Sequence, residues 1–239
     1  MPDITRPHPV TDRAAVIFDL DGTLVDTAAD LAAALNRVLR QAGHAALAPT
    51  FIATLVGDGS RALVAQALDA VGAGGDEARV AAFTERFLAD YTAHVAVLSR
   101  PYPGAVETLA ALREAGFALG VCTNKAQDPS ERLLAALGLD RFLDAIVGAD
   151  AVARRKPDGG HVLATLARLG VAPARALMVG DGPNDVAAAR AAGVAVVIVD
   201  HGDRHDPAAA LGADIVVTGL AAVPTAHVRL VRTTGISRK

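Results

Sequence analysis

Residues 16–27, with the sequence VIFDLDGTLVDT, decide the fold prediction for this chain. A short apolar run ends in two carboxylates, Asp19 and Asp21, and then in a Gly-Thr turn. An apolar run bounded in this way indicates a buried strand of a parallel sheet. Ligands of open α/β sheets bind beyond the carboxyl ends of the strands. We therefore expect both acids at a binding edge, where a cation or a proton-transfer task accounts for charge that a buried strand otherwise excludes.

A simple turn and an EF-hand loop fit this motif less well than a binding edge does. Asp and Gly are common turn formers, so the motif could be a turn after a strand. The pattern Asp-x-Asp-Gly-Thr should, however, arise by chance in on the order of one in a thousand chains of this size. An EF-hand loop needs a Glu at its twelfth position, where this chain has Asp30, and Leu24 and Val25 do not suit such a loop.

Composition narrows the class of protein. The chain has 239 residues, enough for one large domain or for one domain with an insertion. Aromatic residues make up 3% and Trp is absent, so Ala, Val and Leu must build the core. The net charge is −3 with mixed signs, and no basic stripe or polybasic helix suggests a nucleic-acid or membrane partner.

The expected location is a reducing cytoplasm. The single cysteine, Cys122, excludes an internal disulfide, and we expect a small buried residue there rather than a nucleophile. Residues 1–12 lack the apolar segment of a signal peptide, and no apolar run approaches 18 residues.

Six apolar runs predict the strands of the core: 14–20, 118–123, 145–147, 176–180, 194–200 and 214–218. From residue 118 onward they alternate with segments of helical period at 129–137, 161–169 and 185–192. Such alternation is typical of right-handed βαβ units, and it predicts an α/β fold with a Rossmann-like, doubly wound parallel sheet.

The interval 27–100 predicts a second unit. It contains amphipathic segments at 28–42, 50–55, 61–71 and 77–94 and no convincing strand. A connection this long with helices of its own indicates an inserted helical cap. We expect a catalytic core at 13–26 and 101–225, a hinge with two prolines at 100–104, and flexible tails at 1–12 and 226–239.

Three further signals follow the later strands: Cys122-Thr123-Asn124, Lys156-Pro157-Asp158, and Gly180-Asp181 with an acid at 185. Each has an ordinary alternative, because Thr123 could cap a helix, Lys156 could be solvated and Asp181 could be a turn residue. All of them, however, fall at one edge of one predicted sheet.

Together these motifs resemble the haloacid dehalogenase-like superfamily and, within it, the phosphoglycolate phosphatase-like branch with a helical cap. The matching pieces are DLDGTLVDT at 19–27, Thr123-Asn124-Lys125, Lys156-Pro157, and Gly180-Asp181 followed by Asp185. They occur in the order of the family, and the resemblance covers residues 14–224.

The resemblance implies a role for each acid. Asp19 would be the nucleophile that forms an aspartyl-phosphate, and Asp21 would be the general acid and base. A carboxylate cannot approach a phosphate dianion unaided, so Mg²⁺ is implied, held by the Asp19 carboxylate, the Asp21 backbone carbonyl and Asp181. Asp185 would orient a neighbouring lysine or a metal-bound water.

The resemblance also implies the phosphate-binding and specificity residues. Thr123, Asn124 and Lys156 would hold the phosphoryl oxygens. In the predicted cap, the loop Gly57-Asp58-Gly59 and Arg61 resembles the loop that such phosphatases present to the active site. Arg61 could pair with a substrate carboxylate, although a solvated Arg in a Gly-rich helix junction is the alternative.

The expected activity is therefore Mg²⁺-dependent hydrolysis of a small phosphorylated metabolite, with 2-phosphoglycolate as the best guess. A sugar phosphate, an amino-sugar phosphate, a nucleotide or pyrophosphate stays open as the substrate. A phosphomutase would need a cap His–Lys pattern, which 28–43 lacks, and a non-catalytic phosphate binder would lack one of the catalytic groups. A monomer and a homodimer both fit the sequence.

Overall fold

The computed structural model describes residues 13–202 and 208–226. The tails expected to be flexible lie outside the described residues, apart from Ala226. Among the helices of the described ranges, none combines the length and the apolar character that crossing a bilayer requires.

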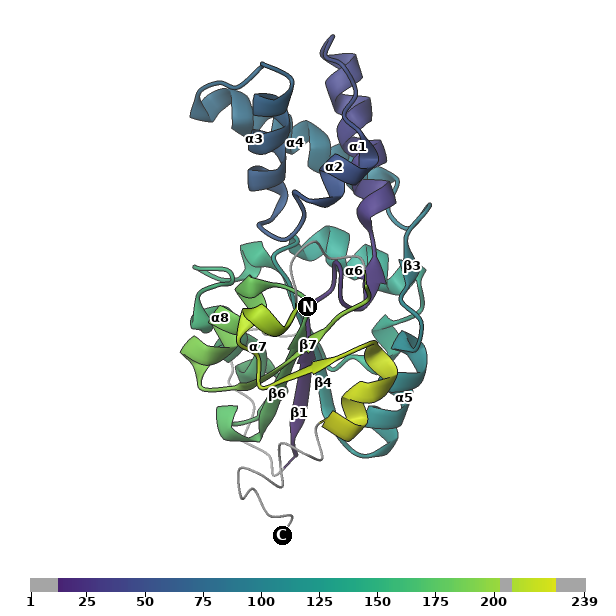
Figure 1. Ribbon diagram of the computed structural model, residues 1–239, viewed down its shortest axis with the longest axis vertical. Coiled ribbons are helices and arrows are strands. Elements are labelled where there is room, and N and C mark those ends of the chain that lie inside the picture. The colour runs from purple at the N-terminus through teal and green to yellow at the C-terminus, as the bar shows by residue number, and fades with distance from the viewer. Residues whose placement is uncertain (1–12, 203–207, 227–239) are drawn as a thin grey trace, which may run out of the picture.

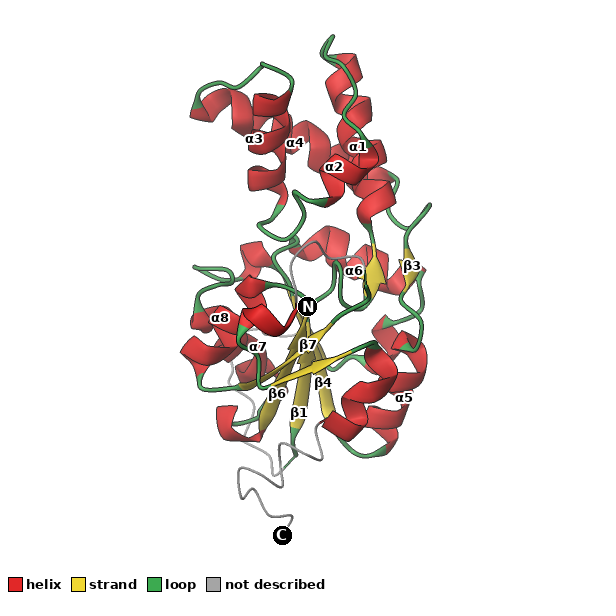
Figure 2. Ribbon diagram, viewed as in Figure 1, coloured by secondary structure: helices red, strands yellow, loops and turns green. Residues whose placement is uncertain are grey.

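The core is a six-stranded parallel sheet with the strand order β5-β4-β1-β6-β7-β8 (Figure 2). The predicted α/β fold is confirmed, and each observed strand lies within a predicted apolar run. The strands are β1 (Ala15–Phe18), β4 (Ala118–Cys122), β5 (Ala145–Val147), β6 (Ala176–Gly180), β7 (Ala195–Val199) and β8 (Ile215–Val217).

Helices cover both faces of this sheet. On one side lie α5 (Ala105–Glu114) and α6 (Gln127–Ala136), and on the other lie α7 (Gly159–Leu169) and α8 (Pro183–Ala192). Short 3₁₀ helices complete the connections: η1 (Asp140–Phe142), η2 (Ala149–Ala151), η3 (Pro173–Arg175), η4 (Ala208–Leu211) and η5 (Leu220–Ala222). Helix α5 was not predicted from the sequence.

The two-residue period of the strands distributes β1 between two hydrophobic cores. Val16 and Phe18 pack in the cluster that contains α5 and α6, whereas Ala15 and Ile17 pack in the cluster that contains α7 and α8. All four residues are fully buried. Side chains of a strand alternate between the two faces, so a strand covered on both sides is apolar throughout. This placement fixes the end of β1, from which the two acids of the motif project.

Four helices between β2 and β3 form a separate cluster at one end of the molecule (Figure 1). They are α1 (Ala28–Gln41), α2 (Pro49–Ala53), α3 (Ser60–Ala70) and α4 (Glu77–Ala93). Their apolar faces pack on one another around Leu35, Leu68 and Phe87, each at most 1% exposed. They stand beyond the carboxyl end of β1, so whatever lies at that edge of the sheet faces them.

The two linkers to these helices pair with each other. Strands β2 (Val25–Asp26) and β3 (Arg100–Pro101) form an antiparallel ladder in the register Val25↔Pro101 and Asp26↔Arg100. The sequence pattern predicts no strand here, only a hinge at 100–104. The prediction missed this ladder because its partners are remote in sequence and each strand has only two residues.

A buried acid, Asp30 in the first turn of α1, fastens the returning linker. Its carboxylate accepts hydrogen bonds from the backbone N–H of Leu98 at 2.9 Å, the backbone N–H of Ser99 at 2.8 Å and the Ser99 hydroxyl at 2.6 Å. The side chain is 4% exposed. A carboxylate that is removed from water is tolerated where donors surround it in this way.

We expect Asp30→Asn to lower the free energy of unfolding by about 1–3 kcal/mol, because its amide group turns an N–H toward a buried donor. Urea denaturation measures this effect. Asp128→Asn is the matched control, since Asp128 forms an exposed ion pair with Arg132, and its expected cost is at most about 0.5 kcal/mol. Equal costs in the two variants would contradict the role of Asp30.

Candidate active site

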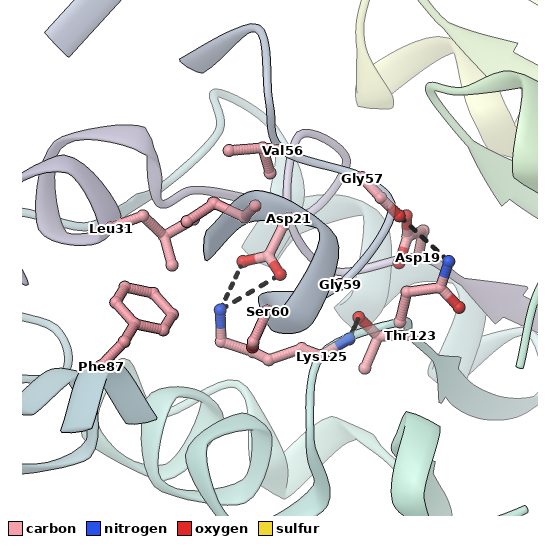
Figure 3. A pocket seen from close by; sticks show the side chains of 12 residues that line it. Asp19, Asp21, Leu31, Val56, Gly57, Gly59, Ser60, Phe87, Thr123 and Lys125 are labelled. Atoms are coloured by element: carbon pink, nitrogen blue, oxygen red, sulfur yellow. Dashed lines mark hydrogen bonds and ion pairs between the residues drawn. The ribbon is translucent and has the colours of Figure 1, made fainter. Parts of the chain in front are cut away.

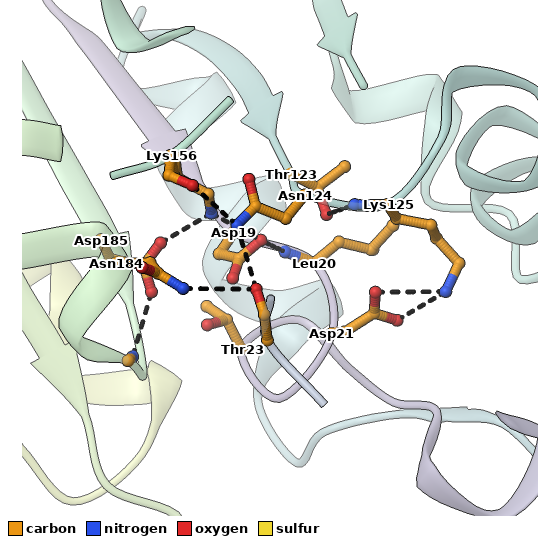
Figure 4. Close-up of polar contacts among 12 residues, drawn as sticks. Asp19, Leu20, Asp21, Thr23, Thr123, Asn124, Lys125, Lys156, Asn184 and Asp185 are labelled. Carbon is orange, nitrogen blue, oxygen red and sulfur yellow. Dashed lines mark hydrogen bonds and ion pairs between the residues drawn. The ribbon is translucent and has the colours of Figure 1, made fainter. Parts of the chain in front are cut away.

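Four loops at the carboxyl ends of β1, β4, β5 and β6 bring the predicted residues together (Figure 4). Asp19 and Asp21 follow β1, Thr123 and Asn124 follow β4, Lys156 lies in the loop between η2 and α7, and Asp181 and Asp185 follow β6. These segments are far apart in the sequence: the hydrogen bond from the Thr23 hydroxyl to Asp181, for example, joins residues 158 positions apart. The sheet is what places them at one point.

Lys156 lies at the centre of this group. Its Nζ is 2.9 Å from Asp19 Oδ1 and 2.7 Å from Asp185 Oδ1, and the residue is 2% exposed. Burial alone would lower the pKa of Lys156, but the carboxylates of Asp185 and Asp19 together raise it above its ordinary value. Lys156 therefore carries a fixed positive charge beside the Asp19 carboxylate.

Asp19 has an unusual acidity. Burial raises its pKa to about 7, against the lowering effect of the Lys156 ammonium, and the charge of Asp185 raises it further. The backbone N–H of Leu20 donates to Asp19 Oδ1 at 2.7 Å, which fixes the orientation of the carboxylate. The charge of Lys156 therefore offsets the burial of this carboxylate only in part, and an additional cation would stabilise its ionised form further.

Three acids form a cluster suited to a cation. One carboxylate oxygen from each of Asp19, Asp181 and Asp185 lies within 4.8 Å of the others. Asp185 is already engaged, because its Oδ2 accepts from the N–H of Gly182 at 3.0 Å and its Oδ1 faces Lys156. Asp19 and Asp181 are the other two candidate ligands, and hard oxygen donors of this kind suit a divalent metal such as Mg²⁺.

Gly22 allows Asp181 to approach the motif. Its φ is +84°, and a Cβ atom built there would lie 2.7 Å from Asp181 Oδ2. Any side chain at this position would displace the carboxylate. The close approach of Asp181 therefore explains why the motif has Gly at position 22, and a simple turn would not require it.

Asp21 lies apart from the three-acid cluster and has its own partners. The Thr27 hydroxyl donates to Asp21 Oδ1 at 2.6 Å, and the ammonium of Lys125 donates to both carboxylate oxygens at 2.9 and 3.1 Å. Lys125 belongs to the Thr123-Asn124-Lys125 motif, but the sequence predicts no role for it. The available signal in the sequence was its position two residues after Thr123. In the structure the residue is only 6% exposed.

Helices α2 and α3 are joined by the loop 54–59, and its residues 57–59 contact the core. Asn124 donates from Nδ2 to the carbonyl oxygens of Gly57 at 3.0 Å and Lys156 at 3.1 Å. Asn184 donates to Asp58 Oδ1 at 2.7 Å, and Arg155 donates to the Asp58 carbonyl at 3.0 Å. The Asn124 side chain thus connects this loop to the loop of Lys156.

A cavity lies between the α1–α4 helices and the sheet edge (Figure 3). From the core, the residues that line it are Asp19, Asp21, Thr123, Asn124 and Lys125. From the α1–α4 segment, they are Leu31, Val56, Gly57, Gly59, Ser60, Leu63 and Phe87. Arg61 does not line it, because its guanidinium pairs with Glu77 at the surface. This placement gives no support to Arg61 as a substrate ligand.

Cys122 is an inert thiol at the end of β4. The residue is fully buried, and burial raises its pKa to about 12. A thiol that stays protonated at neutral pH is no nucleophile. The structural role expected from the sequence agrees with this environment.

His161 on α7 gives the protein a predicted pH dependence. Its ring bonds to the Lys156 backbone N–H and the Val147 carbonyl, and burial lowers its pKa from 6.5 to about 4. As the pH falls, His161 therefore binds a proton in the unfolded chain before it does so in the folded protein. We expect the free energy of unfolding to fall between pH 6.5 and pH 4, with at most about 3 kcal/mol from this group.

Urea titrations across this range measure the pH dependence. His161→Met lacks the titrating group, so its stability should be lower at pH 7 but flatter toward pH 4. Parallel curves for the two proteins would contradict the assignment.

Comparison with known proteins gives consistent results. The sequence pattern of the family described as haloacid dehalogenase-like hydrolase matches residues 16–199. The chain is 44% identical to a phosphoglycolate phosphatase of Caulobacter vibrioides, over 91% of this chain and 92% of the relative. It is 43% identical to a phosphoglycolate phosphatase of Agrobacterium fabrum, over 88% and 90%. The crystal structure of a predicted phosphoglycolate phosphatase from Haemophilus somnus superposes with a TM-score of 0.82 at 30% identity, over 91% of this chain and 99% of that one.

Proposed function

The chain belongs to the haloacid dehalogenase-like hydrolase family, and we propose that it hydrolyses 2-phosphoglycolate to glycolate and inorganic phosphate. The relatives named phosphoglycolate phosphatase, at 43–44% identity over about nine-tenths of the chain, support this substrate. The observation that carries the reaction class is the pair formed by Asp19 and Asp21. Asp19 lies beside the buried Lys156 and close to Asp181 and Asp185, and Asp21 lines the same cavity as Asp19.

In the proposed reaction, Asp19 is the nucleophile. A carboxylate oxygen of Asp19 forms a bond to phosphorus while the bond from phosphorus to the ester oxygen breaks. Asp21 donates a proton to the departing oxygen, so glycolate leaves as the alcohol. A water molecule then attacks the phosphorus of the aspartyl-phosphate and gives its proton to Asp21. Inorganic phosphate leaves, and Asp19 is again a free carboxylate.

Lys156, Thr123 and Asn124 are the proposed phosphoryl-binding groups. The Lys156 ammonium is already held within 2.9 Å of the nucleophile, so it needs no reorganisation when charge develops on the phosphoryl oxygens. Thr123 Oγ1 accepts a hydrogen bond from the Lys125 N–H at 3.2 Å and keeps its own proton for a ligand oxygen. The side chain of Asn124 acts by fixing the loop of Lys156, and its backbone N–H would be the group that faces phosphate.

Mg²⁺ is the proposed metal, held by the carboxylates of Asp19 and Asp181 and by the backbone carbonyl of Asp21. When bound, it neutralises charge on the nucleophile and on the phosphoryl group. The raised pKa of Asp19 supports this assignment, because Lys156 offsets the burial of the carboxylate only in part and a bound cation would stabilise its ionised form. Asp185 would position Lys156 and the 181–182 backbone rather than bind the metal.

The deciding experiment is phosphate release from a panel of esters with Mg²⁺ or with excess EDTA. The panel contains 2-phosphoglycolate, hexose phosphates, an amino-sugar phosphate, nucleotides and pyrophosphate. We expect the highest kcat/KM for 2-phosphoglycolate. In EDTA this kcat/KM should fall at least about 10²-fold, because a bound metal stabilises the charged transition state by several kcal/mol. Metal-dependent activity that peaks on another ester would replace the substrate but keep the reaction. Release that is insensitive to EDTA would contradict the metal assignment.

A further inference from the structure

Lys125 is a charged residue of the cavity to which the proposed reaction assigns no role. Among the described residues that line the cavity, it is the only one with a cationic side chain, and two carboxylates, Asp19 and Asp21, lie with it (Figure 3). The residue is 6% exposed, although an ammonium in such a place is costly unless anions surround it. Asp21 supplies one anion, and Lys125 lines the cavity in which a substrate would supply a second.

We propose that the Lys125 ammonium binds the carboxylate of the substrate and thereby makes the enzyme selective for a carboxylated phosphate ester. The proposal rests on the proposed function, which supplies a substrate that carries both a phosphate and a carboxylate. In that substrate a single carbon separates the carboxylate from the ester oxygen. Asp21 must reach the ester oxygen, and Lys125 Nζ lies 2.9 Å from Asp21 Oδ1. The carboxylate is therefore delivered to the neighbourhood of the ammonium.

The donors of Lys125 are compatible with a third partner. Its two short contacts are directed at one carboxylate, that of Asp21, and it also interacts with the side chain of Tyr91, whose ring centre lies 4.4 Å from Nζ. An ammonium has three N–H donors and can bridge two carboxylates. The aromatic face of Tyr91, on α4, attracts the cation and holds it under the α1–α4 helices.

Other groups on the helical side of the cavity agree with a small anion. Helix α3 begins at Ser60 with Gly59 before it, and no side chain caps this end. Both residues line the cavity, so the positive end of the helix faces it. The remaining lining on this side is apolar, from Leu31, Val56, Leu63 and Phe87, and offers few partners to the hydroxyl groups of a larger sugar.

Steady-state kinetics with two matched esters test the proposal. Ethyl phosphate has the carbon skeleton of 2-phosphoglycolate with a methyl group in place of the carboxylate. For each protein, the measured quantity is the ratio of kcat/KM for 2-phosphoglycolate to kcat/KM for ethyl phosphate. We expect Lys125→Met to lower this ratio about 10- to 100-fold, the usual effect of losing one charged hydrogen bond. Lys125→Arg, which keeps the charge, should recover part of it.

Two further variants separate Lys125 from other cations. Arg132→Met removes an exposed charge from α6, the helix that follows Lys125, and should leave the ratio unchanged. Arg61→Met removes the rival carboxylate ligand, and should also leave it unchanged because Arg61 does not line the cavity. A ratio that falls in Arg61→Met and not in Lys125→Met would overturn the proposal.

The ratio also distinguishes a Lys125 that binds the substrate carboxylate from one that only positions Asp21. If Lys125 only positions Asp21, Lys125→Met lowers both kcat/KM values by one factor and the ratio stays constant, which overturns the proposal and leaves the proposed function intact. A wild-type enzyme with no preference for 2-phosphoglycolate would overturn both. If Lys125→Met does not fold, Lys125→Gln replaces it.

A binding measurement gives a second readout without turnover. Calorimetric titration of Asp19→Asn with 2-phosphoglycolate and with ethyl phosphate should show tighter binding of the former. Adding Lys125→Met to that background should remove the difference.

Discussion

Asp19→Asn is expected to lower kcat for phosphate release by at least about 10³-fold, because loss of the nucleophile removes the whole covalent route. The amide keeps the size of the side chain, and the Leu20 N–H can still donate to its oxygen. Folding should therefore be intact, as measured by circular dichroism. Asp128→Asn, an exposed carboxylate on α6, is the control and should retain the wild-type kcat. Turnover retained in Asp19→Asn would contradict the covalent mechanism.

Mg²⁺ should reverse the order in which the wild type and Asp19→Asn unfold on heating. The folded-state pKa of Asp19 is raised to about 7 from 3.8, so the metal-free wild type loses stability as pH rises between these values. In EDTA at pH 8, Asp19→Asn should unfold at an equal or higher temperature than the wild type. Saturating Mg²⁺ should reverse this order, since a ligand that binds only the folded state stabilises it. An order that does not change with Mg²⁺ would contradict Asp19 as a metal ligand.

The core could be predicted from the sequence because its signals are local. Strand β1 is apolar at every position, and the acids directly after it mark where it ends. In a parallel sheet the carboxyl ends meet at one edge, so the motifs near Asp19, Thr123, Lys156 and Asp181 were expected to come together, and the structure places them there.

The missed features depend on contacts between remote residues. The β2–β3 ladder pairs Val25 with Pro101, and neither two-residue strand has a periodic signal of its own. The contact between Lys125 and Asp21 spans 104 residues. The expectation for Arg61 relied on its place beside a Gly-rich loop. Its ion pair with Glu77, which begins α4, could not be read from that loop.

Lys156→Met is expected to damage both stability and activity. It leaves the carboxylates of Asp19 and Asp185 without their ammonium, and breaking a buried ion pair by removing one partner costs about 3–5 kcal/mol. Urea denaturation in EDTA measures this effect. Phosphate release should fall at least about 10²-fold, the usual effect of losing one donor to the transition-state oxygens.

A double variant separates the two roles of Lys156. Asp185→Asn added to Lys156→Met removes one of the carboxylates that the methionine leaves unpaired, so part of the lost stability should return. Activity should not return, because no ammonium faces the phosphoryl group in either protein. If the double variant recovered activity together with stability, Lys156 would act only by holding the acids in place. If it recovered neither, the coupling between Lys156 and Asp185, 2.7 Å apart, would not account for the stability of this edge of the sheet.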